Sequence, residues 1–214
     1  MKNKFLKLFV FVFILVGSTA SAQSFEGIIK FQKQTDLANT NYVYYVKGDK
    51  VRIDELDKNG KTDGSFLVDL KANTMLSLNY DRKLYMDKKA GASASVNANC
   101  VVTKTKNVKA IMGYNCREYV VKNTTDNTQI SYWIAESKFN FFHRLLKLLN
   151  RKDKSSVYIQ QIVGLKGEFP FSSVETTITD NKQVNRMDVT EITQKTLDAS
   201  LFEVPKDFKK FDGK

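Results

Sequence analysis

Short apolar stretches separated by turn residues recur along most of this chain, and this rhythm limits the folds open to it. Tyr42–Val46 is aromatic and β-branched, turn residues follow, and Val51–Asp54 alternates between apolar and charged residues. This pattern predicts a β-hairpin, because side chains alternate between the two faces of a strand. The apolar residues of the second strand are expected to face the core, with Arg52 and Asp54 facing water.

Comparable pairs of stretches follow along the chain. They are Ser65–Leu70 with Met75–Leu78 and Lys83–Met86, Glu118–Val121 with Ile130–Ala135, and Val174–Thr179 with Arg186–Ile192. Turn signals spaced about eight to twelve residues apart predict antiparallel strands joined in sequence, as a sandwich or a barrel-like sheet. The small, polar stretch Ala90–Ala98 is expected to form a loop.

One segment departs from the β pattern. Between Ser137 and Lys154, apolar residues at helical spacing predict an amphipathic helix. The residues of this apolar stripe are Phe142, Leu145, Leu146 and Leu149, and the basic residues largely off it are Arg144, Lys147, Arg151 and Lys152. Three interpretations stay open. The helix covers the open face of a sheet, which we favour, lies on a membrane surface, or fills an apolar concavity until a ligand displaces it.

The start of the chain has the pattern of a secretory signal peptide. Three lysines precede the unbroken apolar run Leu8–Val16, and small residues ending in Ala20-Ser21-Ala22 follow it. The apolar run is shorter than the roughly 20 residues that a membrane-spanning helix needs. We therefore predict cleavage after Ala22, leaving residues 23–214 as a single domain that is periplasmic or secreted.

The net charge and the predicted export of the chain together limit the classes of partner that it could bind. Without the three lysines of the leader, the chain has 31 basic and 23 acidic residues, a formal charge of +8. A basic, aromatic-rich chain can bind nucleic acid, but export removes it from most nucleic acid, so no such partner is expected. The candidate partners are a lipid or acyl chain, an envelope protein, and an anionic membrane surface. The alternative is that the lysines bind no partner and only keep the protein soluble.

Cys100 and Cys116 are the only cysteines of the chain. An even pair in an oxidising compartment favours a disulfide, and two buried free thiols are the alternative. The only histidine, His143, is far from both in sequence, so neither a zinc site nor any other cofactor is predicted.

The sequence contains few candidates for catalysis. His143 lies among Phe and Leu residues without a nucleophile motif nearby, and the G-x-S-x-G, H-E-x-x-H and Walker-type motifs are absent. We therefore predict no catalytic residues and no enzyme. An exported hydrolase remains a third hypothesis, which requires two carboxylates facing each other across a cleft.

Two stretches resemble a known family. Ile111–Tyr119, followed by Tyr132-Trp133-Ile134, resembles the I-x-G-Y-x-C-x-x-Y … W-I signature of the domain of unknown function 4412 family of exported proteins. Leu201–Phe208 resembles the L-F-x-x-P ending of that family and of LolA-like carriers. The resemblance covers nearly all of residues 25–208. It implies a LolA-like half-barrel, a mainly β, curved and unclosed antiparallel sheet with one or more amphipathic helices on its concave face.

LolA-like proteins hold lipoprotein acyl chains on that face, and the resemblance supplies no catalytic residues. We therefore expect an exported, non-catalytic binding protein that holds a lipid or another apolar ligand in the concave sheet. The residues expected to line the ligand are Tyr44, Tyr132, Trp133, Phe142, Leu145, Leu146 and Leu149. The alternative is a structural or interaction module of the cell envelope with a filled core. Its protein partner would contact the basic helix face at Arg144, Lys147 and Arg151.

Overall fold

The computed structural model of the protein describes residues 24–89, 99–136 and 138–211. The predicted signal peptide and the predicted loop Ala90–Ala98 lie outside the described residues. Cleavage after Ala22 and the limits of the mature domain therefore remain predictions.

The described residues form twelve β-strands, two α-helices and one short 3-10 helix. The strands are β1 (Gly27–Thr35), β2 (Asn39–Lys47), β3 (Lys50–Leu56), β4 (Thr62–Asp69), β5 (Thr74–Asn79), β6 (Leu84–Lys88), β7 (Val101–Ile111), β8 (Tyr114–Asn123), β9 (Thr128–Ala135), β10 (Phe169–Thr177), β11 (Gln183–Gln194) and β12 (Lys209–Lys210). The helices are α1 (Phe141–Leu149), α2 (Lys154–Ile159) and the 3-10 helix η1 (Ala199–Phe202).

All the described strands belong to one sheet, in the order β12-β6-β5-β4-β3-β2-β1-β11-β10-β9-β8-β7. From β1 to β6 the chain adds hairpin after hairpin in one direction. It then crosses to the opposite edge at β7 and returns strand by strand until β11 pairs with β1. Neighbouring strands are antiparallel, apart from the parallel contact of β12 with β6.

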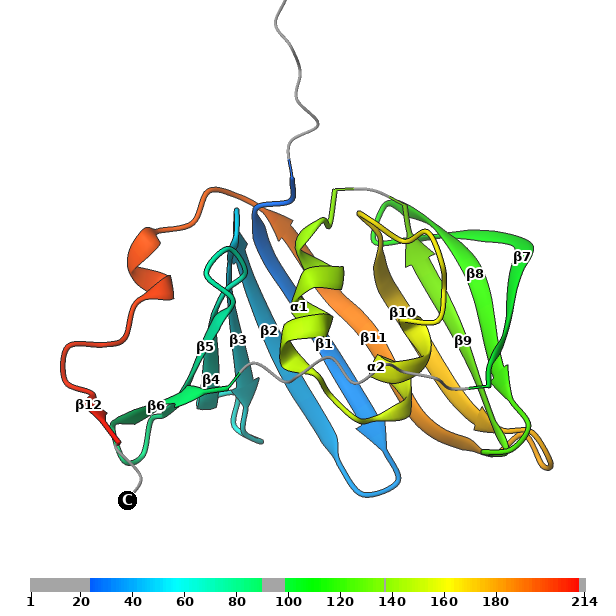
Figure 1. Ribbon diagram of the computed structural model, residues 1–214, viewed down its shortest axis with the longest axis horizontal. Helices are drawn as coiled ribbons and strands as arrows, with labels where there is room; N and C mark the ends of the chain where they lie inside the picture. The colour runs from blue at the N-terminus through cyan, green and yellow to red at the C-terminus, as the bar shows by residue number, and fades with distance from the viewer. Residues whose placement is uncertain (1–23, 90–98, 137, 212–214) are drawn as a thin grey trace, which may run out of the picture.

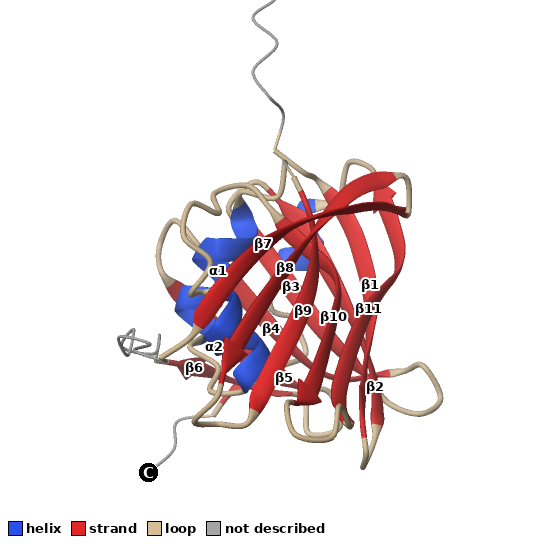
Figure 2. Cartoon of the chain, turned by 90° about the vertical axis from the view of Figure 1, so that its right-hand side faces the viewer, coloured by secondary structure: helices blue, strands red, loops and turns tan. Residues whose placement is uncertain are grey.

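The sheet curves around the helical segment. Figure 1 shows α1 and α2 crossing in front of its middle strands, and Figure 2 shows the strands bending around them. The predicted fold class is confirmed: the sheet is unclosed and antiparallel, with helices on its concave face.

The hairpin predicted first is formed by β2 and β3, with Val46 opposite Val51. The expectation that Arg52 and Asp54 face water is wrong. Asp54 is only 2% exposed, and the Arg52 Nε lies 2.7 Å from its Oδ1. The C-terminal segment covers this side of the sheet, where the carbonyl of Leu201 accepts a hydrogen bond from Arg52 Nη1. The alternation of the strand correctly predicted that Val51 and Ile53 face the core. It did not predict that the C-terminal segment covers the opposite face.

The glycine of the G-Y-x-C motif closes the turn between β7 and β8. Met112 and Gly113 both have positive φ, 50° and 79°, as the two central residues of a tight hairpin turn require. Tyr114 then packs its ring against Phe171 at 4.9 Å. These residues of the motif stabilise the fold.

The predicted helix between Ser137 and Lys154 is shorter than expected and is followed by a second one. Asn150 ends α1 in the left-handed conformation (φ 45°, ψ 43°). Asp153 then begins α2, because its side chain accepts a hydrogen bond from the backbone N–H of Ser156. Ser137 itself lies outside the described residues. The helix covers the sheet, as the favoured interpretation predicted.

The predicted disulfide between Cys100 and Cys116 is wrong for this structure, in which both are free thiols. Cys100 precedes Val101, whose partner on β8 is Lys122. Cys116 lies six positions along β8 from Lys122, or about 20 Å, whereas a disulfide needs Cα atoms within about 7 Å. Burial raises the pKa of the Cys116 thiol to about 11.

Candidate functional site

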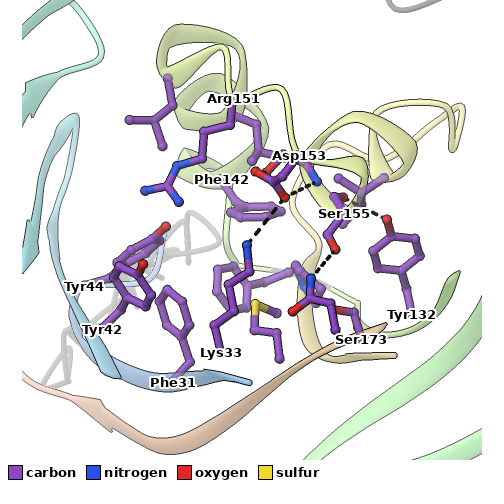
Figure 3. Close-up of a pocket in the computed structure, with 18 residues that line it drawn as sticks. Phe31, Lys33, Tyr42, Tyr44, Tyr132, Phe142, Arg151, Asp153, Ser155 and Ser173 are labelled. Carbon is purple, nitrogen blue, oxygen red and sulfur yellow. Dashed lines mark hydrogen bonds and ion pairs between the residues drawn. The ribbon is translucent and has the colours of Figure 1, made fainter. Parts of the chain in front are cut away.

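A hollow lies between the concave face of the sheet and the two helices (Figure 3). Its volume is about 80 Å³. The apolar side chains of its wall come from β1, β2 and β11 on one side and from the helical segment and β10 on the other. They include Phe31, Tyr42, Tyr44 and Met187 from the first group, and Phe142, Leu146, Leu149, Ile159 and Phe169 from the second.

Aromatic rings form the wall contributed by β1 and β2. Phe31 stacks on Tyr42 with ring centroids 5.2 Å apart and meets Tyr44 edge-on at 4.8 Å. Burial raises the pKa of the Tyr44 phenol, so this group stays neutral and presents a hydroxyl to the hollow. The wall combines apolar area with polar tips, which suits an amphipathic ligand.

Three charged side chains line the hollow where the chain passes from α1 to α2. Lys33 Nζ on β1 lies 3.9 Å from Asp153 Oδ1. The guanidinium of Arg151 lies 6.0 Å from the centre of the Tyr42 ring and points toward Tyr42 and Tyr44 in Figure 3. Burial opposes the charge of Arg151, but nearby phenol and carboxyl groups raise its pKa overall.

A hydrogen-bonded polar cluster also lines the hollow. Tyr132 donates a hydrogen bond from its hydroxyl to the carbonyl of Ser155 (2.8 Å), and Asn185 Nδ2 donates to Ser155 Oγ (3.0 Å). Asn185 is 8% exposed. Its Oδ1 is the one buried side-chain nitrogen or oxygen atom among the described residues that lacks a hydrogen-bond partner. If the amide were turned over, its nitrogen would be unpaired instead. A polar group of a ligand would satisfy either atom.

An ion pair ties α1 to the turns beside it. Arg144 Nη1 lies 2.6 Å from Asp49 Oδ1 between β2 and β3, and Nη2 donates to the carbonyl of Leu70 at 2.9 Å. Both side chains of the pair are close to half exposed. The pair therefore adds little to global stability, but it attaches α1 to the turns at Asp49 and Leu70.

We expect Arg144→Ala to speed amide exchange in α1 by up to about fivefold, because an exposed pair contributes up to about 1 kcal/mol. Hydrogen–deuterium exchange of a peptide covering residues 141–149 would measure this effect, with β8 as the internal reference. Lys147→Ala is the control, since Lys147 is exposed on the same helix. Equal exchange in both variants would contradict a role for Arg144 in holding α1.

Five of the seven residues predicted to line a ligand border this hollow. They are Tyr44, Tyr132, Phe142, Leu146 and Leu149. Leu145 does not border it, because it is fully buried in the core between α1 and the sheet. Trp133 does not border it either. It follows Tyr132 on β9 and so faces the other side of the sheet, where the Lys109 ammonium lies 3.9 Å from its ring centre.

The sequence pattern did not identify the polar members of the site, which are Lys33, Arg151, Asp153 and Asn185. Arg151 was placed on the polar face of one long helix, but α1 ends before it and the turn redirects it into the hollow. The signals were present in the sequence. Asn150 is a residue that tolerates a left-handed helix end, and Asp153 precedes Ser156 at the spacing of a helix N-cap.

A second, more open hollow lies beside the edge strand β7. It contains two glutamates, and both already have partners: Glu136 pairs with Arg117, and Glu168 accepts from the backbone N–H of Gly167. Within the described part of the chain, no cluster of three or more His, Cys, Asp or Glu residues could hold a metal ion. None of the described helices has the length and apolar character needed to cross a membrane.

Comparisons with known proteins give one family and several solved structures. The family model described as "Domain of unknown function (DUF4412)" matches residues 25–208. A search of the curated proteins found no match.

Three solved structures illustrate the structural similarity. PNGF-II is 16% identical with a TM-score of 0.45, and the match covers 86% of this chain but only 30% of PNGF-II. An uncharacterized conserved protein from Thermus thermophilus is 8% identical with a TM-score of 0.48, covering 86% of this chain and 88% of that one. A LolA superfamily protein from Nitrosomonas europaea is 9% identical with a TM-score of 0.35, covering 86% and 91%. None of these similarities identifies a ligand or an activity.

Proposed function

The chain belongs to the DUF4412 family, a domain of unknown function, and we propose that it is an exported, non-catalytic binding protein. It holds a lipid or another apolar ligand between its concave sheet and α1. The observation that carries this proposal is the hollow under α1, where an aromatic wall adjoins an unpaired buried amide atom. A core that only stabilised the fold would be expected to leave neither the space nor the unpaired atom.

The size of the hollow indicates how a ligand would enter. A volume of about 80 Å³ is small beside the roughly 300–1,000 Å³ of common ligand pockets. A long acyl chain would therefore have to shift α1 outward from the sheet, with Phe142, Leu146 and Leu149 still lining the enlarged space. This helix is attached by side-chain packing and the Arg144–Asp49 pair rather than by a strand ladder. The proposal thus joins two of the interpretations that the sequence left open: the helix covers the sheet, and a ligand displaces it.

The chemistry of the hollow favours binding over catalysis. Asp153 is the only carboxylate among the described residues that line it, and it already caps α2 and lies beside Lys33. Hydrolysis by paired carboxylates needs two such groups facing each other. His143 is outside the lining, and burial lowers its pKa.

The leader predicted over residues 1–22 supports a periplasmic or secreted location. An oxidising compartment permits disulfides but does not require one. The free thiol of Cys116 is fully buried.

The alternative function, an interaction module that binds a protein partner through the basic face of the helix, is less well supported than ligand binding. Its expected contact face was Arg144, Lys147 and Arg151, but Arg144 is engaged with Asp49, and Arg151 lines the hollow. Only Lys147 of the three remains exposed without an ion pair among the described residues.

The test is mass analysis of what copurifies with the exported protein, followed by uptake of a fluorescent fatty acid after delipidation. We expect one bound lipid per chain, or saturable uptake at that ratio. Leu149→Trp should weaken uptake about tenfold or more, because the larger ring occupies the hollow that Leu149 borders. Leu37→Trp is the matched control, since Leu37 is 97% exposed. An empty protein without uptake would refute the proposal.

A further inference from the structure

We infer that the ligand of this hollow is an amphiphile with an anionic head group, which Arg151 binds where α1 passes into α2. This inference rests on the proposed function and adds the chemical class of the ligand.

Arg151 differs from the other arginines of the chain. Four of the six pair with a carboxylate: Arg52, Arg117, Arg144 and Arg186. Arg82 is exposed to solvent. Arg151 is half buried, yet no carboxylate within the described ranges comes within ion-pair distance of it. A charge withdrawn from water without a counter-ion is unfavourable, so an anion at this position would be stabilising.

The groups around Arg151 do not neutralise it. Asp153, the nearest acidic residue of the lining, lies beside Lys33, so the three charged lining residues have a net charge of +1. Glu55 is exposed on β3, opposite Tyr42, and acts on Arg151 only from beyond ion-pair distance. An oxyanion would find the guanidinium and the neutral Tyr42 and Tyr44 hydroxyls on one side, all of them hydrogen-bond donors.

The rest of the hollow fits the other end of such a ligand. Leu149 lies two residues before Arg151, and Leu146 and Phe142 continue the apolar wall back along α1. A guanidinium at one end and an apolar wall along the other match an acyl chain that ends in a carboxylate or phosphate. Asn185 then offers one unpaired hydrogen-bonding atom to a polar group near the head.

The test compares ligands with the same chain and different heads. The delipidated protein is titrated calorimetrically with dodecanoate, dodecyl phosphate, 1-dodecanol and dodecyltrimethylammonium, each below its micelle-forming concentration. We expect at least one anion to bind about tenfold or more tightly than the alcohol, and the cation to bind most weakly. The ratio of dodecanoate to dodecyl phosphate affinity then distinguishes a fatty acid from a phosphate-headed lipid.

Variants separate the head contact from the apolar contact. Arg151→Met should remove the preference for the anions and leave the affinity for 1-dodecanol unchanged, whereas Lys147→Met, on the exposed face of α1, should change neither. If wild-type protein binds dodecanol and the anions equally, the inference is overturned while the proposed function stands. If none of the four ligands binds, the proposed function fails with it. Because the head-group comparison uses wild-type protein, it holds even if a variant misfolds.

Discussion

Phe139→Ala is expected to lower the free energy of unfolding by about 3 to 5 kcal/mol, the cost of removing a fully buried aromatic ring. Phe139 is 0% exposed and lies just before α1. Four ring centroids lie between 5.2 and 5.8 Å from its own, those of Phe25, Phe169, Tyr114 and Phe171. They come from the segment before β1 and from β8 and β10, so no single element can close the cavity that alanine would leave.

Urea denaturation of the purified protein would measure this loss. Phe211→Ala makes the same chemical change at a ring that is 49% exposed, and it should cost about 0.5 kcal/mol or less. A comparable loss in both variants would contradict the view that Phe139 joins the helical segment to the sheet. Because Phe139 anchors the start of α1, its loss should also speed amide exchange in that helix.

The strands were predictable because their signal is local. Alternation along Val51–Asp54 and turn residues before it determine a hairpin without help from distant segments. The structure pairs these residues as expected, with Tyr44 opposite Ile53. The order of strands in the sheet is not a local property. The pairing of β1 with β11 joins residues at least 150 positions apart, and this architecture was predicted only through the resemblance to a family.

Two errors share one physical cause, which is that distant segments decide the environment of a residue. Asp54 was expected in water because its strand alternates, yet the segment around Leu201 covers it. Cys100 and Cys116 are close in sequence and were expected to bond, but the β7–β8 hairpin holds them at opposite ends. Neither the cover nor the register could be derived from the residues themselves.

The apolar half of the site was predicted better than its polar half. Helical spacing identified Phe142, Leu146 and Leu149, and these residues do face the hollow. Arg151 was misplaced because the periodicity was continued through Asn150, where the helix ends. A polar residue that breaks a helix contributes nothing to a hydrophobic pattern. The direction of the Arg151 side chain, which follows Asn150, therefore cannot be predicted until the conformation of the turn is known.

Asp54→Ala is expected to cost about 3 to 5 kcal/mol of folding free energy, because it leaves a buried charge without its partner. The Asp54 carboxylate accepts hydrogen bonds from Nε and Nη2 of Arg52, at 2.7 and 2.9 Å, and from the Ser65 hydroxyl at 2.5 Å. The side chain of Arg52 is 16% exposed, so water can replace the lost carboxylate only in part. Arg52 also donates to Tyr80 and to the carbonyl of Leu201, which connects the C-terminal segment to the same cluster.

The control is a second ion pair on the sheet with very different exposure. Lys30 and Glu191 are 46% and 49% exposed, and Glu191→Ala should change the free energy of unfolding by about 1 kcal/mol or less. The double variant Arg52→Met/Asp54→Leu removes both charges and should recover part of the loss seen in Asp54→Ala, since no unpaired guanidinium remains. If the double variant is less stable than the single one, the cost comes from the lost hydrogen bonds to Ser65, Tyr80 and Leu201. The cluster would then stabilise the fold by attaching the C-terminal segment to the sheet rather than by compensating a buried charge.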